Sequence, residues 1–174
     1  MQKLQASLLF TTLTATLLGA CAAPQNAGVQ APFVQERVHP QARVKMIIPH
    51  GWSVQEQPDG ALALTDSSDG INIDVKVVDG ADLGTALLTV ATGILLGYDN
   101  LGLDGAPVDN TINGMPALFQ DGHATVQGHP VSLSVGVIDT PADKFLLIVG
   151  EGDPAALRAH ETDVRAFINS IVPM

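Results

Sequence analysis

Residues 131–149 read VSLSVGVIDTPADKFLLIV, and they set the architecture that the rest of the chain has to complete. In the first part, Val131–Ile138, apolar residues alternate with serine and glycine, which is typical of a strand with one buried face. In the last part, Phe145–Val149, every residue is apolar, which indicates a strand in the middle of a sheet with both faces covered. The sequence therefore predicts a sheet that carries a covering layer on each side.

Other stretches of the chain show the alternation and the bounding turn signals of strands. The clearest is Ile71–Val77, in which apolar and polar residues alternate without exception. The pair Asn113-Gly114 indicates a hairpin turn. A second connection, Gln127–Pro130, joins the predicted strands Met115–Val126 and Val131–Ile138. The remaining predicted strands are Val44–Ile48, Trp52–Glu56, Ala61–Thr65, Val108–Ile112 and Met115–Val126.

The period changes to that of a helix in two segments. Ala81–Gly97 repeats apolar residues at spacings of three and four, and Asp79 or Asp82 can cap its start. Tyr98–Pro107, which follows, is rich in Gly and Asp and is predicted to be a loop. The second helix begins with Asp153-Pro154, an N-cap followed by proline at the first helical position, and runs almost to the end of the chain.

The order of these elements is several strands, a helix, several more strands and a terminal helix, which is typical of an α+β fold. We expect a single domain over residues 43–174, built as a mainly antiparallel sheet covered by helices on both faces, an α/β/α sandwich. A chain of this length buries enough surface to form its own core.

The composition excludes several classes of protein. The chain has 46% hydrophobic and 15% charged residues, as an ordinary globular domain has. Its formal net charge of −10 has the wrong sign for binding phosphate backbones, so nucleic-acid binding is disfavoured. Cys21 is the only cysteine, which rules out an intrachain disulfide and the usual Cys/His zinc site.

The N-terminus, MQKLQASLLFTTLTATLLGAC, has the pattern of an export signal, because Leu8–Leu18 is apolar but too short to span a bilayer. Its end, Leu18-Gly19-Ala20-Cys21, resembles the lipobox of bacterial lipoproteins. The resemblance implies a signal peptide over residues 1–20, cleavage before Cys21 and acylation of that cysteine, which would anchor the protein in a membrane. The alternative is an ordinary secretory signal cleaved near Ala23, with an incidental cysteine.

The next segment, Ala22–Ala42, mixes Pro, Gln, Ala and Gly without a sustained period, which predicts a flexible tether between the lipidated Cys21 and the domain. By resemblance to the sorting rules of enterobacterial lipoproteins, Ala22 after the cysteine favours the outer membrane over the inner membrane. We therefore expect a lipid-anchored protein of the bacterial cell envelope that faces the periplasm.

Five short motifs, taken in their order along the chain, resemble those of PsbP-like domains. They are IPHGWSV at 48–54, Asp59-Gly60, the strand at 71–77 with its following helix, INGMPA at 112–117 and FINSI at 167–171. This superfamily of α/β/α sandwiches includes an extrinsic photosystem II subunit, a nuclear-import factor that binds a small GTPase, and many bacterial lipoproteins. The resemblance covers about residues 43–172 and implies a binding or assembly accessory rather than an enzyme.

Candidate metal ligands occur near the longest predicted hairpin, where His123, His129 and Asp121 could approach one another. They lack the spacing of a recognised metal motif, so we favour solvated side chains and expect no metal and no other cofactor. The acidic segments Asp66–Gly70 and Asp99–Asp109 contain oxygen ligands that calcium would accept. Neither has the ligand spacing of an EF-hand, and turns are the stronger interpretation.

No catalytic residue can be assigned from the sequence, because no serine lies in a G-x-S-x-G context and no carboxylate pair lies in a recognisable cleft. Trp52 is expected to be a packing anchor rather than a ligand stack. The helix Leu83–Tyr98 is apolar almost all round, so it is either buried, which is the default, or an exposed element that contacts a partner or a membrane. The serines considered are Ser67, Ser68, Ser132, Ser134 and Ser170.

These observations lead to one functional hypothesis: a lipoprotein whose domain is a non-catalytic binding or assembly accessory for an envelope protein partner or a small apolar ligand. The alternatives are a cell-envelope hydrolase whose site is not visible as a motif, and a purely structural envelope component. A deep pocket with convergent polar groups would favour the enzyme, and a broad apolar patch would favour the binder. The most informative observation is whether the segments 83–98 and 98–107 border a cavity.

Replacing Cys21 by serine tests the lipid anchor. Each buried methylene of an acyl chain contributes about 0.8 kcal/mol to membrane binding, so losing two or three chains should release the protein into the soluble periplasmic fraction. Ala23→Ser, which keeps the cysteine, is the matched control and should stay with the membranes. Fractionation and immunoblotting measure the location and the length of the chain. A Cys21→Ser protein that has lost residues 1–20 and still remains with the membranes would show that the anchor is not a lipid on this residue.

Overall fold

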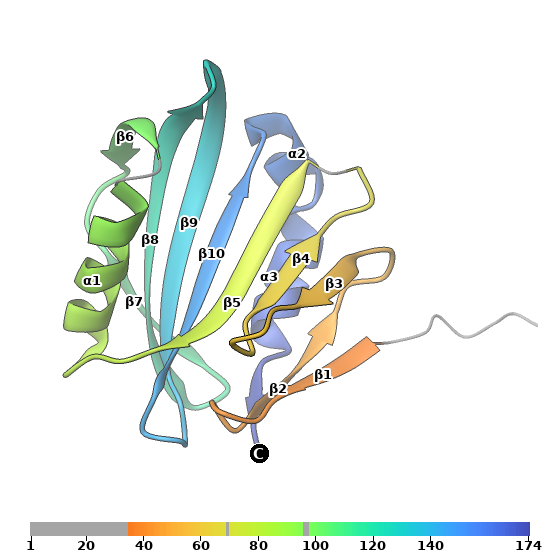
Figure 1. Cartoon of the computed structure of the whole chain (residues 1–174), viewed down its shortest axis with the longest axis vertical. Coiled ribbons are helices and arrows are strands. Elements are labelled where there is room, and N and C mark those ends of the chain that lie inside the picture. Colours follow the sequence, from red (N-terminus) through yellow and green to blue (C-terminus); the bar gives the residue numbers. More distant parts are fainter. Residues whose placement is uncertain (1–34, 69, 96–97) are drawn as a thin grey trace, which may run out of the picture. The chain divides into compact units, whose positions relative to one another are not determined.

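A computed structural model describes residues 35–68, 70–95 and 98–174, in which strands predominate and three helices are present (Figure 1). The helices are α1 (Leu83–Leu95), α2 (Pro154–Ala159) and α3 (Glu161–Asn169). The strands are β1 (Gln35–His39), β2 (Val44–Ile48), β3 (Ser53–Glu56), β4 (Leu62–Thr65), β5 (Ile71–Val78), β6 (Asp99–Leu103), β7 (Val108–Ile112), β8 (Met115–Val126), β9 (His129–Asp139), β10 (Phe145–Gly152) and β11 (Val172–Pro173).

Eight of these strands form the main sheet, in the order β3-β4-β5-β10-β9-β8-β6, with β7 also paired to β8. The other three form a second sheet in the order β1-β2-β11. Every strand pair within the described residues is antiparallel. The predicted α+β class with a mainly antiparallel sheet is therefore confirmed.

Strand β10 lies at the centre of the main sheet, as its uniformly apolar sequence predicts. It pairs with β5 on one side and with β9 on the other. Leu146 and Ile148 belong to the hydrophobic core on one face, and Leu147 belongs to the core on the other face. All three side chains are buried, so both faces of this strand are removed from water.

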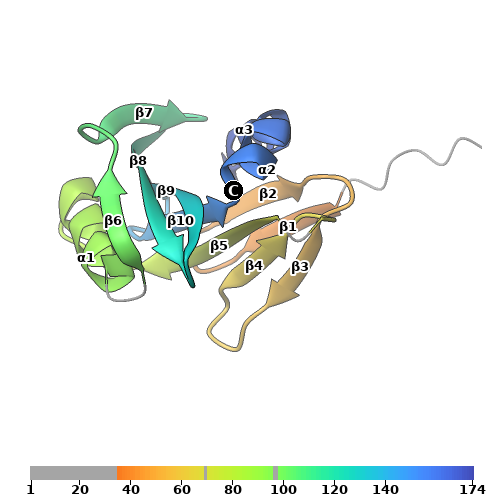
Figure 2. The ribbon, with the colours of Figure 1, turned by 90° about the horizontal axis from the view of Figure 1, so that it is seen from above.

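Two layers cover the main sheet on opposite faces (Figure 2). One face packs against α2, α3 and the three-stranded sheet, in a core that includes Met46, Phe167 and Ile171. The other face packs against α1 through Ala86 and Leu87. The predicted helix on each face is confirmed, with a small sheet added to one of the two layers.

Two tight turns lie at opposite ends of β8 and join it to β7 and to β9. Asn113 and Gly114, between β7 and β8, have φ of 48° and 86°, and Gln127 and Gly128, between β8 and β9, have φ of 52° and 84°. Positive φ at both central residues is the geometry of a type I′ turn, whose twist matches that of the strands it joins. The Asn113-Gly114 hairpin is confirmed, whereas the second turn is shorter than predicted because β9 already begins at His129.

The folded part of the chain begins earlier than predicted. We expected a flexible tether as far as Ala42, but Gln35–His39 form β1 and pair with β2, and Ala42 itself is fully buried. The sequence of β1 has no alternating pattern, because only His39 of its residues is buried. A strand held mainly by backbone hydrogen bonds at a sheet edge leaves little hydrophobic signal in the sequence. The rest of the predicted tether lies outside the described residues.

A strand also replaces part of a predicted loop. Asp99–Leu103, inside the predicted loop Tyr98–Pro107, form β6 and pair with β8. At Gly102 a Cβ atom would lie only 2.5 Å from Nε2 of His123. The glycine that indicated a loop therefore leaves space on β6 for the imidazole ring of His123 from β8.

The predicted C-terminal helix is divided into α2 and α3. Asp153 caps α2 as predicted, because its carboxylate accepts hydrogen bonds from the backbone N–H groups of Ala155 and Ala156. The first helix ends at His160, with φ of −106° and ψ of 13°, and α3 begins at Glu161. Neither glycine nor proline marks this break, so the periodicity alone predicted one continuous helix.

Helix α1 is buried on one side only. Asp82, one of the two predicted caps, accepts a hydrogen bond from the backbone N–H of Thr85 at 2.7 Å. Ala86 and Leu87 are buried, but Leu88 is 69% exposed. The default expectation of a buried helix is therefore confirmed for one face, and the exposed face carries no charged residue along the whole of α1.

His39, at the end of β1, is 2% exposed, and neither of its ring nitrogens has a hydrogen-bond partner within residues 35–68, 70–95 and 98–174. Burial lowers the pKa of His39 below its usual value, although the backbone and the charge of Glu56 act in the opposite direction. The unfolded chain then binds a proton on this residue at a higher pH than the folded chain does. The free energy of unfolding should consequently decrease as the pH falls below about 6.5.

Replacing His39 by leucine should remove both this pH dependence and the two unpaired nitrogens. We expect His39→Leu to raise the free energy of unfolding by about 1 kcal/mol at neutral pH and to flatten its decrease between about pH 7 and pH 5. Urea denaturation at several pH values measures both effects. His50→Leu, at an exposed position, is the matched control, and an equal pH profile in the wild type and in His39→Leu would contradict the assignment.

Candidate functional site

An apolar cavity of about 280 Å³ lies between α1 and the face of the main sheet that α1 covers. Helix α1 and the segment 98–107 that follows it both border this cavity. This arrangement favours a protein that binds a ligand. Helix α1 contributes Gly84, Leu87, Leu88 and Ala91, β6 and its neighbourhood contribute Leu101, Leu103 and Pro107, and β8 and β9 contribute Leu118, Gln120, Asp121, Gly122, Leu133 and Val135.

The lengths of the elements explain why a cavity forms here. Strand β8 has 12 residues and spans about 40 Å, whereas α1 has 13 residues and spans only about 20 Å. One helix therefore leaves part of the β8–β9 face uncovered. Strand β6 pairs with the far end of β8, and its leucines close the cavity from that side.

The wall of the cavity is almost entirely apolar. The alternation of β8 places Leu118 and Gln120 on the face toward α1 and puts the side chain of Asp121 on the opposite face. Gln120 is thus the polar side chain in the described wall. It is 6% exposed, its Nε2 donates to the backbone carbonyl of Asp121 at 2.8 Å, and its Oε1 has no hydrogen-bond partner among the residues that the structure describes.

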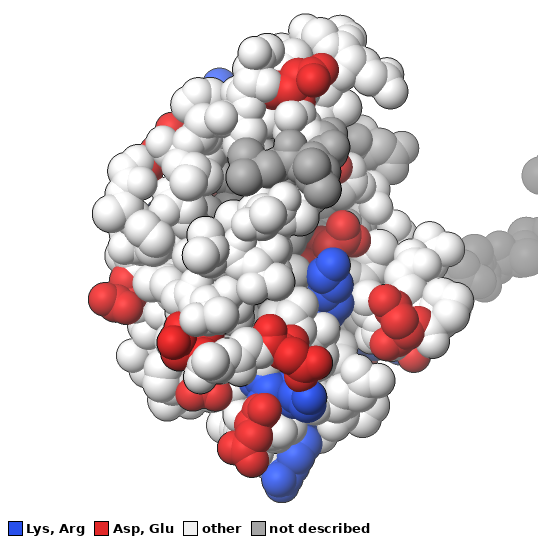
Figure 3. All heavy atoms as spheres, turned by 60° about the vertical axis from the view of Figure 1, so that its left-hand side comes forward, with Lys and Arg blue, Asp and Glu red and all other residues white. Residues whose placement is uncertain are grey.

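Apolar residues also surround the cavity on the outside. Leu88 of α1 and Leu103 of β6 both line it, and they are 69% and 58% exposed. Viewed from the side on which α1 lies, a broad area of the molecule carries no charged side chain (Figure 3). The cavity therefore has an apolar rim as well as an apolar wall, as expected of a site that admits a ligand from an apolar surface.

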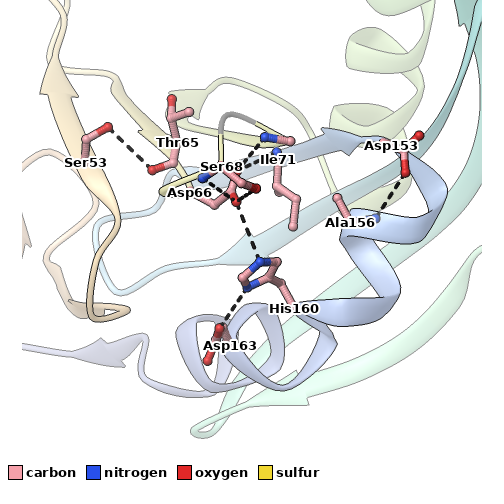
Figure 4. A network of polar contacts seen from close by, with 10 residues as sticks. Ser53, Thr65, Asp66, Ser68, Ile71, Asp153, Ala156, His160 and Asp163 are labelled. Carbon is pink, nitrogen blue, oxygen red and sulfur yellow. Dashed lines mark hydrogen bonds and ion pairs between the residues drawn. The ribbon is translucent and has the colours of Figure 1, made fainter.

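A polar network on the other side of the sheet is the second candidate site (Figure 4). The side chain of Asp66 is fully buried and accepts hydrogen bonds from the backbone N–H groups of Ser68, Gly70 and Ile71 at 3.1, 2.7 and 2.8 Å. The hydroxyl of Ser68 also donates to this carboxylate. Burial alone would raise the pKa of Asp66, but these hydrogen bonds to the ionised form outweigh it and lower the pKa.

His160 joins this network from the break between α2 and α3. Its Nε2 lies 3.7 Å from the Asp66 carboxylate, its Nδ1 lies 3.1 Å from that of Asp163, and its ring packs edge-on against Trp52. Ser68 donates to Asp66 rather than to the imidazole, so the serine is not activated as a nucleophile. The network holds a turn and a helix junction together, and it makes Trp52 the packing anchor that was predicted.

A third cluster brings Tyr98, Asp74 and Glu151 together on the α1 side of β5 and β10. The Tyr98 hydroxyl donates to Glu151, and burial together with that carboxylate raises the pKa of Tyr98. Burial and then the charge of Glu151 also raise the pKa of Asp74. These residues do not line the apolar cavity, so they are not in position to act on a molecule bound there.

A more polar surface groove runs between the α2–α3 layer and the opposite face of β8 and β9. Two adjoining hollows of about 380 and 450 Å³ form it. Both hollows are lined by Asp104, Asp121, Ser134, Glu161 and Arg165, and the last two already form an ion pair at 2.7 Å. The charges in this groove are exposed and partly satisfied by one another, so it defines a ligand less sharply than the apolar cavity does.

The histidines considered as metal ligands do not come together. His123 lies opposite Ser132 and His129 lies opposite Val126, so the two imidazoles are on opposite faces of the hairpin. His123 instead contacts the carboxylate of Asp104 at 2.9 Å. Within the described residues, no group of three or more His, Cys, Asp or Glu side chains could hold a metal ion.

The acidic segments have structural roles in the described residues. The Asp66 turn is held by its own carboxylate, and the whole segment 99–109 lies in β6, the connection at 104–107 and the start of β7. Of the serines, Ser170 accepts from the backbone of Ile47, and Ser132 and Ser134 line the polar groove. Cys21 and the lipobox lie outside the described residues. No described helix is long and apolar enough to cross a membrane.

Sequence reasoning missed Gln120 and the strand that closes the cavity. Gln120 interrupts the apolar alternation Leu118, Gln120, Gly122 on the buried face of β8, and a polar residue at an otherwise apolar position was the available signal. The leucines of β6 were hidden in a segment whose glycines and aspartates indicated a loop. Only the pairing of β6 with β8 brings them to the cavity.

No protein-family model and no curated protein sequence matches this chain. Several solved structures are similar to it in fold. Cyanobacterial PsbP (CyanoP) from Synechocystis sp. PCC 6803 has a TM-score of 0.61 at 13% identity, over 88% of this chain and 97% of that one. LpqN of Mycobacterium tuberculosis, which is involved in cell envelope biogenesis, has a TM-score of 0.60 at 13% identity, over 80% of this chain and 91% of that one.

The Ran-binding protein Mog1p of Saccharomyces cerevisiae is also similar, with a TM-score of 0.55 at 13% identity, over 81% of this chain and 95% of that one. The chain therefore has the PsbP-like and Mog1-like α+β fold that its motifs led us to expect. At this level of identity the similarity defines the fold and leaves the function to the residues of the site.

Substitution of Asp66 tests whether the polar network is structural. We expect Asp66→Asn to lower the free energy of unfolding by about 1–2 kcal/mol at neutral pH, because a neutral amide is a weaker acceptor for the three backbone N–H groups. The folded-state pKa is lowered, so the wild type should lose this contribution as the pH falls below about 4, and the variant should not. Urea denaturation near pH 7 and pH 3 measures the difference.

Asp163→Asn, which changes the exposed carboxylate beside the same histidine, is the matched control and should alter stability by less than about 0.5 kcal/mol. If both variants are equally stable, the buried carboxylate does not hold this part of the fold.

Proposed function

We propose that this protein is a lipid-anchored lipoprotein of the bacterial cell envelope, facing the periplasm, whose domain is a non-catalytic binding accessory for a small apolar ligand. The main support for a small apolar ligand is the apolar cavity between α1 and the main sheet. The anchor rests on the lipobox resemblance of Leu18–Cys21, and the preference for the outer membrane rests on Ala22. An envelope protein partner, the other binding role expected from the sequence, is the alternative to a small ligand.

The size and the wall of the cavity support a small apolar ligand. An aliphatic cavity of about 150 Å³ in another protein holds one benzene molecule. A cavity of about 280 Å³ therefore has room for a ligand of roughly twice that size. Each buried methylene contributes about 0.8 kcal/mol, so a chain of several carbons binds measurably without any charged contact.

The chemistry of the wall supports binding rather than catalysis. The described lining residues include no serine, cysteine, histidine or lysine, and the amide of Gln120 is neither an acid nor a base nor a nucleophile at neutral pH. Two of the similar structures are consistent with a non-catalytic role in the cell envelope, because one is a Ran-binding protein and another is involved in cell envelope biogenesis.

Filling the cavity should abolish ligand binding. Ala91 of α1 lines the cavity, so its replacement by phenylalanine places a ring in the ligand volume, whereas Thr92→Phe puts the same ring on the exposed side of the helix. The probe is N-phenyl-1-naphthylamine, a neutral dye whose fluorescence rises in an apolar site. It is larger than two benzene rings, so part of it would lie against the exposed apolar rim formed by Leu88 and Leu103. We expect the mature chain, residues 21–174 with Cys21→Ser and hence no acyl chain, to bind the dye. Thr92→Phe should bind it equally, and Ala91→Phe should bind it at least tenfold more weakly, since a filled cavity offers no apolar surface to bury.

Gly84→Leu gives a second way to narrow the cavity, because a Cβ at this position meets no described neighbour closer than Asp82 Oδ1 at 3.4 Å. Thermal melting establishes that each variant is folded. If folded Ala91→Phe and Gly84→Leu bind the dye as the parent does, the cavity is not the ligand site.

A further inference from the structure

The side of α1 that faces away from the sheet carries exposed apolar side chains and no charge. Leu88 of α1 and Leu103 of β6 are 69% and 58% exposed, and both lie at the rim of the cavity. The sequence Leu83–Leu95 contains no Asp, Glu, Lys or Arg, and a broad area of the molecule on this side is uncharged (Figure 3). An exposed apolar area marks a contact with a partner or a membrane. The outer α1 surface is defined here as Leu88, Thr89, Thr92 and Leu103.

The two hydroxyl groups of the outer α1 surface do not depend on water for their hydrogen bonds. Thr89 and Thr92 are exposed, yet the hydroxyl of Thr89 donates to the backbone carbonyl of Thr85 and that of Thr92 donates to the backbone carbonyl of Leu88, both at 2.8 Å. A donor that is paired within its own helix can enter an apolar medium without losing that hydrogen bond. The outer α1 surface can therefore be removed from water at little cost, although two of its residues are polar.

The same feature favours a lipid surface over a protein partner. A typical protein–protein interface contains about ten direct hydrogen bonds in addition to its apolar contacts. The four residues of the outer α1 surface offer no charge, and the hydroxyl donors that they carry are already paired. Binding of an interfacial helix to a bilayer depends instead on the apolar area that it buries.

The charge of the rest of the molecule also directs this surface toward a bilayer. The chain has a formal net charge of −10, so anionic lipids repel it. This repulsion extends over about 8 Å at physiological ionic strength, which means that it acts mainly on charges close to the membrane. The domain therefore meets least repulsion when an uncharged part of its surface is turned toward the lipid.

The chain between the proposed anchor and the domain keeps the bilayer within reach. From Cys21 to Gln35, the first described residue, it can span at most about 50 Å when fully extended. A domain of this size has a radius of gyration of about 14 Å and is about 40 Å across. The anchor would thus allow any side of the domain to touch the membrane, and it would raise the effective concentration of the bilayer so that a weak contact is sufficient.

From these observations we infer that the outer α1 surface lies on the lipid bilayer to which Cys21 is anchored, so that the rim of the cavity meets the membrane. The inference rests on the proposed function, since the anchor brings the domain to the bilayer and the cavity receives the ligand. Leu88 and Leu103 belong both to the rim of the cavity and to the outer α1 surface. An apolar ligand then passes from the membrane into the cavity without being exposed to water, which is unfavourable for apolar surface.

The single cysteine allows the anchored state to be rebuilt in vitro. The mature chain, residues 21–174, can be coupled through the thiol of Cys21 to a maleimide lipid in phosphatidylcholine vesicles whose acyl chains carry bromine, which quenches tryptophan at short range. Thr92→Trp reports on the outer α1 surface. Val38→Trp is the matched control, because Val38 is 50% exposed on β1, in the layer on the opposite face of the main sheet. Trp52 is buried in that layer and gives the same background in every variant.

We expect the brominated chains to quench the added fluorescence of Thr92→Trp by about half or more and that of Val38→Trp by less than about a tenth, since only the first side chain enters the interface. Adding Leu88→Asp to Thr92→Trp should reduce the quenching at least threefold, because an unpaired charge opposes entry into the lipid. Val38→Asp adds the same charge on the opposite layer and should leave the quenching unchanged.

The lipid composition gives an independent readout. Replacing about a third of the phosphatidylcholine by anionic phosphatidylglycerol should weaken the quenching of Thr92→Trp at low salt, and added salt should restore it by screening the repulsion. Attachment through positive charge would show the opposite dependence on both. Thermal melting establishes that each variant is folded, and Thr89→Asp replaces Leu88→Asp if the latter does not fold.

The outcomes distinguish this inference from the proposed function. If Thr92→Trp is quenched no more than Val38→Trp while the soluble chain binds the dye, the cavity stands and the contact with the bilayer is overturned. The contact is likewise overturned if size-exclusion chromatography shows a dimer that Leu88→Asp dissociates, since the outer α1 surface is then an interface between copies. If the dye does not bind and Cys21→Ser does not release the protein from membranes, the proposed function fails and the inference fails with it.

Discussion

Strand β10 carries apolar side chains on both faces, and each face must be covered for the fold to exist. Leu146 and Ile148 face a layer of two helices and a three-stranded sheet, which covers its side of the main sheet broadly. Leu147 faces a layer that contains α1 alone among the helices described. A helix of 13 residues is about half as long as the hairpin that it covers, so the second layer is incomplete. The apolar cavity follows directly from this mismatch, since the strand face that α1 leaves open remains apolar.

Polar groups in the interior divide into two kinds, and the difference carries functional information. The Asp66 carboxylate is fully buried, yet backbone N–H groups and a hydroxyl satisfy it, so it stabilises a turn and a helix junction. Gln120 and His39 are buried with unpaired atoms, and they lie in different parts of the molecule. Gln120 lines a cavity that has room for a ligand. His39 lies in an edge strand, and its burial makes the free energy of unfolding depend on pH. A buried polar group whose hydrogen bonds are all made stabilises the fold. A buried polar group without a hydrogen-bond partner destabilises it, and its presence needs a separate explanation.

The domain and the N-terminal segment serve separate tasks in the proposed function. The anchor would need only Cys21 and its acyl chains, and the ligand site needs only α1 and one half of the main sheet. Solved structures from a cyanobacterium, a yeast and a mycobacterium share this fold at 13% identity to the chain, so the fold by itself does not define a binding site. In this chain the candidate site is the set of apolar residues that line the cavity.

Local signals determined the parts of the fold that depend on neighbouring residues: the alternation of β5, the apolar run of β10, the Asn113-Gly114 turn and the Asp153 cap. The structure alone revealed β1 and β6, because an edge strand is held by backbone hydrogen bonds to a distant partner and leaves little pattern in its own side chains. It also placed His123 and His129 on opposite faces, since a two-residue turn sets the register of the hairpin and the register decides the face. The cavity and the unpaired oxygen of Gln120 belong to the same category. A sequence shows which residues are apolar or polar. Whether an apolar surface is covered by other side chains, and whether a buried polar group has a hydrogen-bond partner, depends on the distances between segments that are far apart in the sequence.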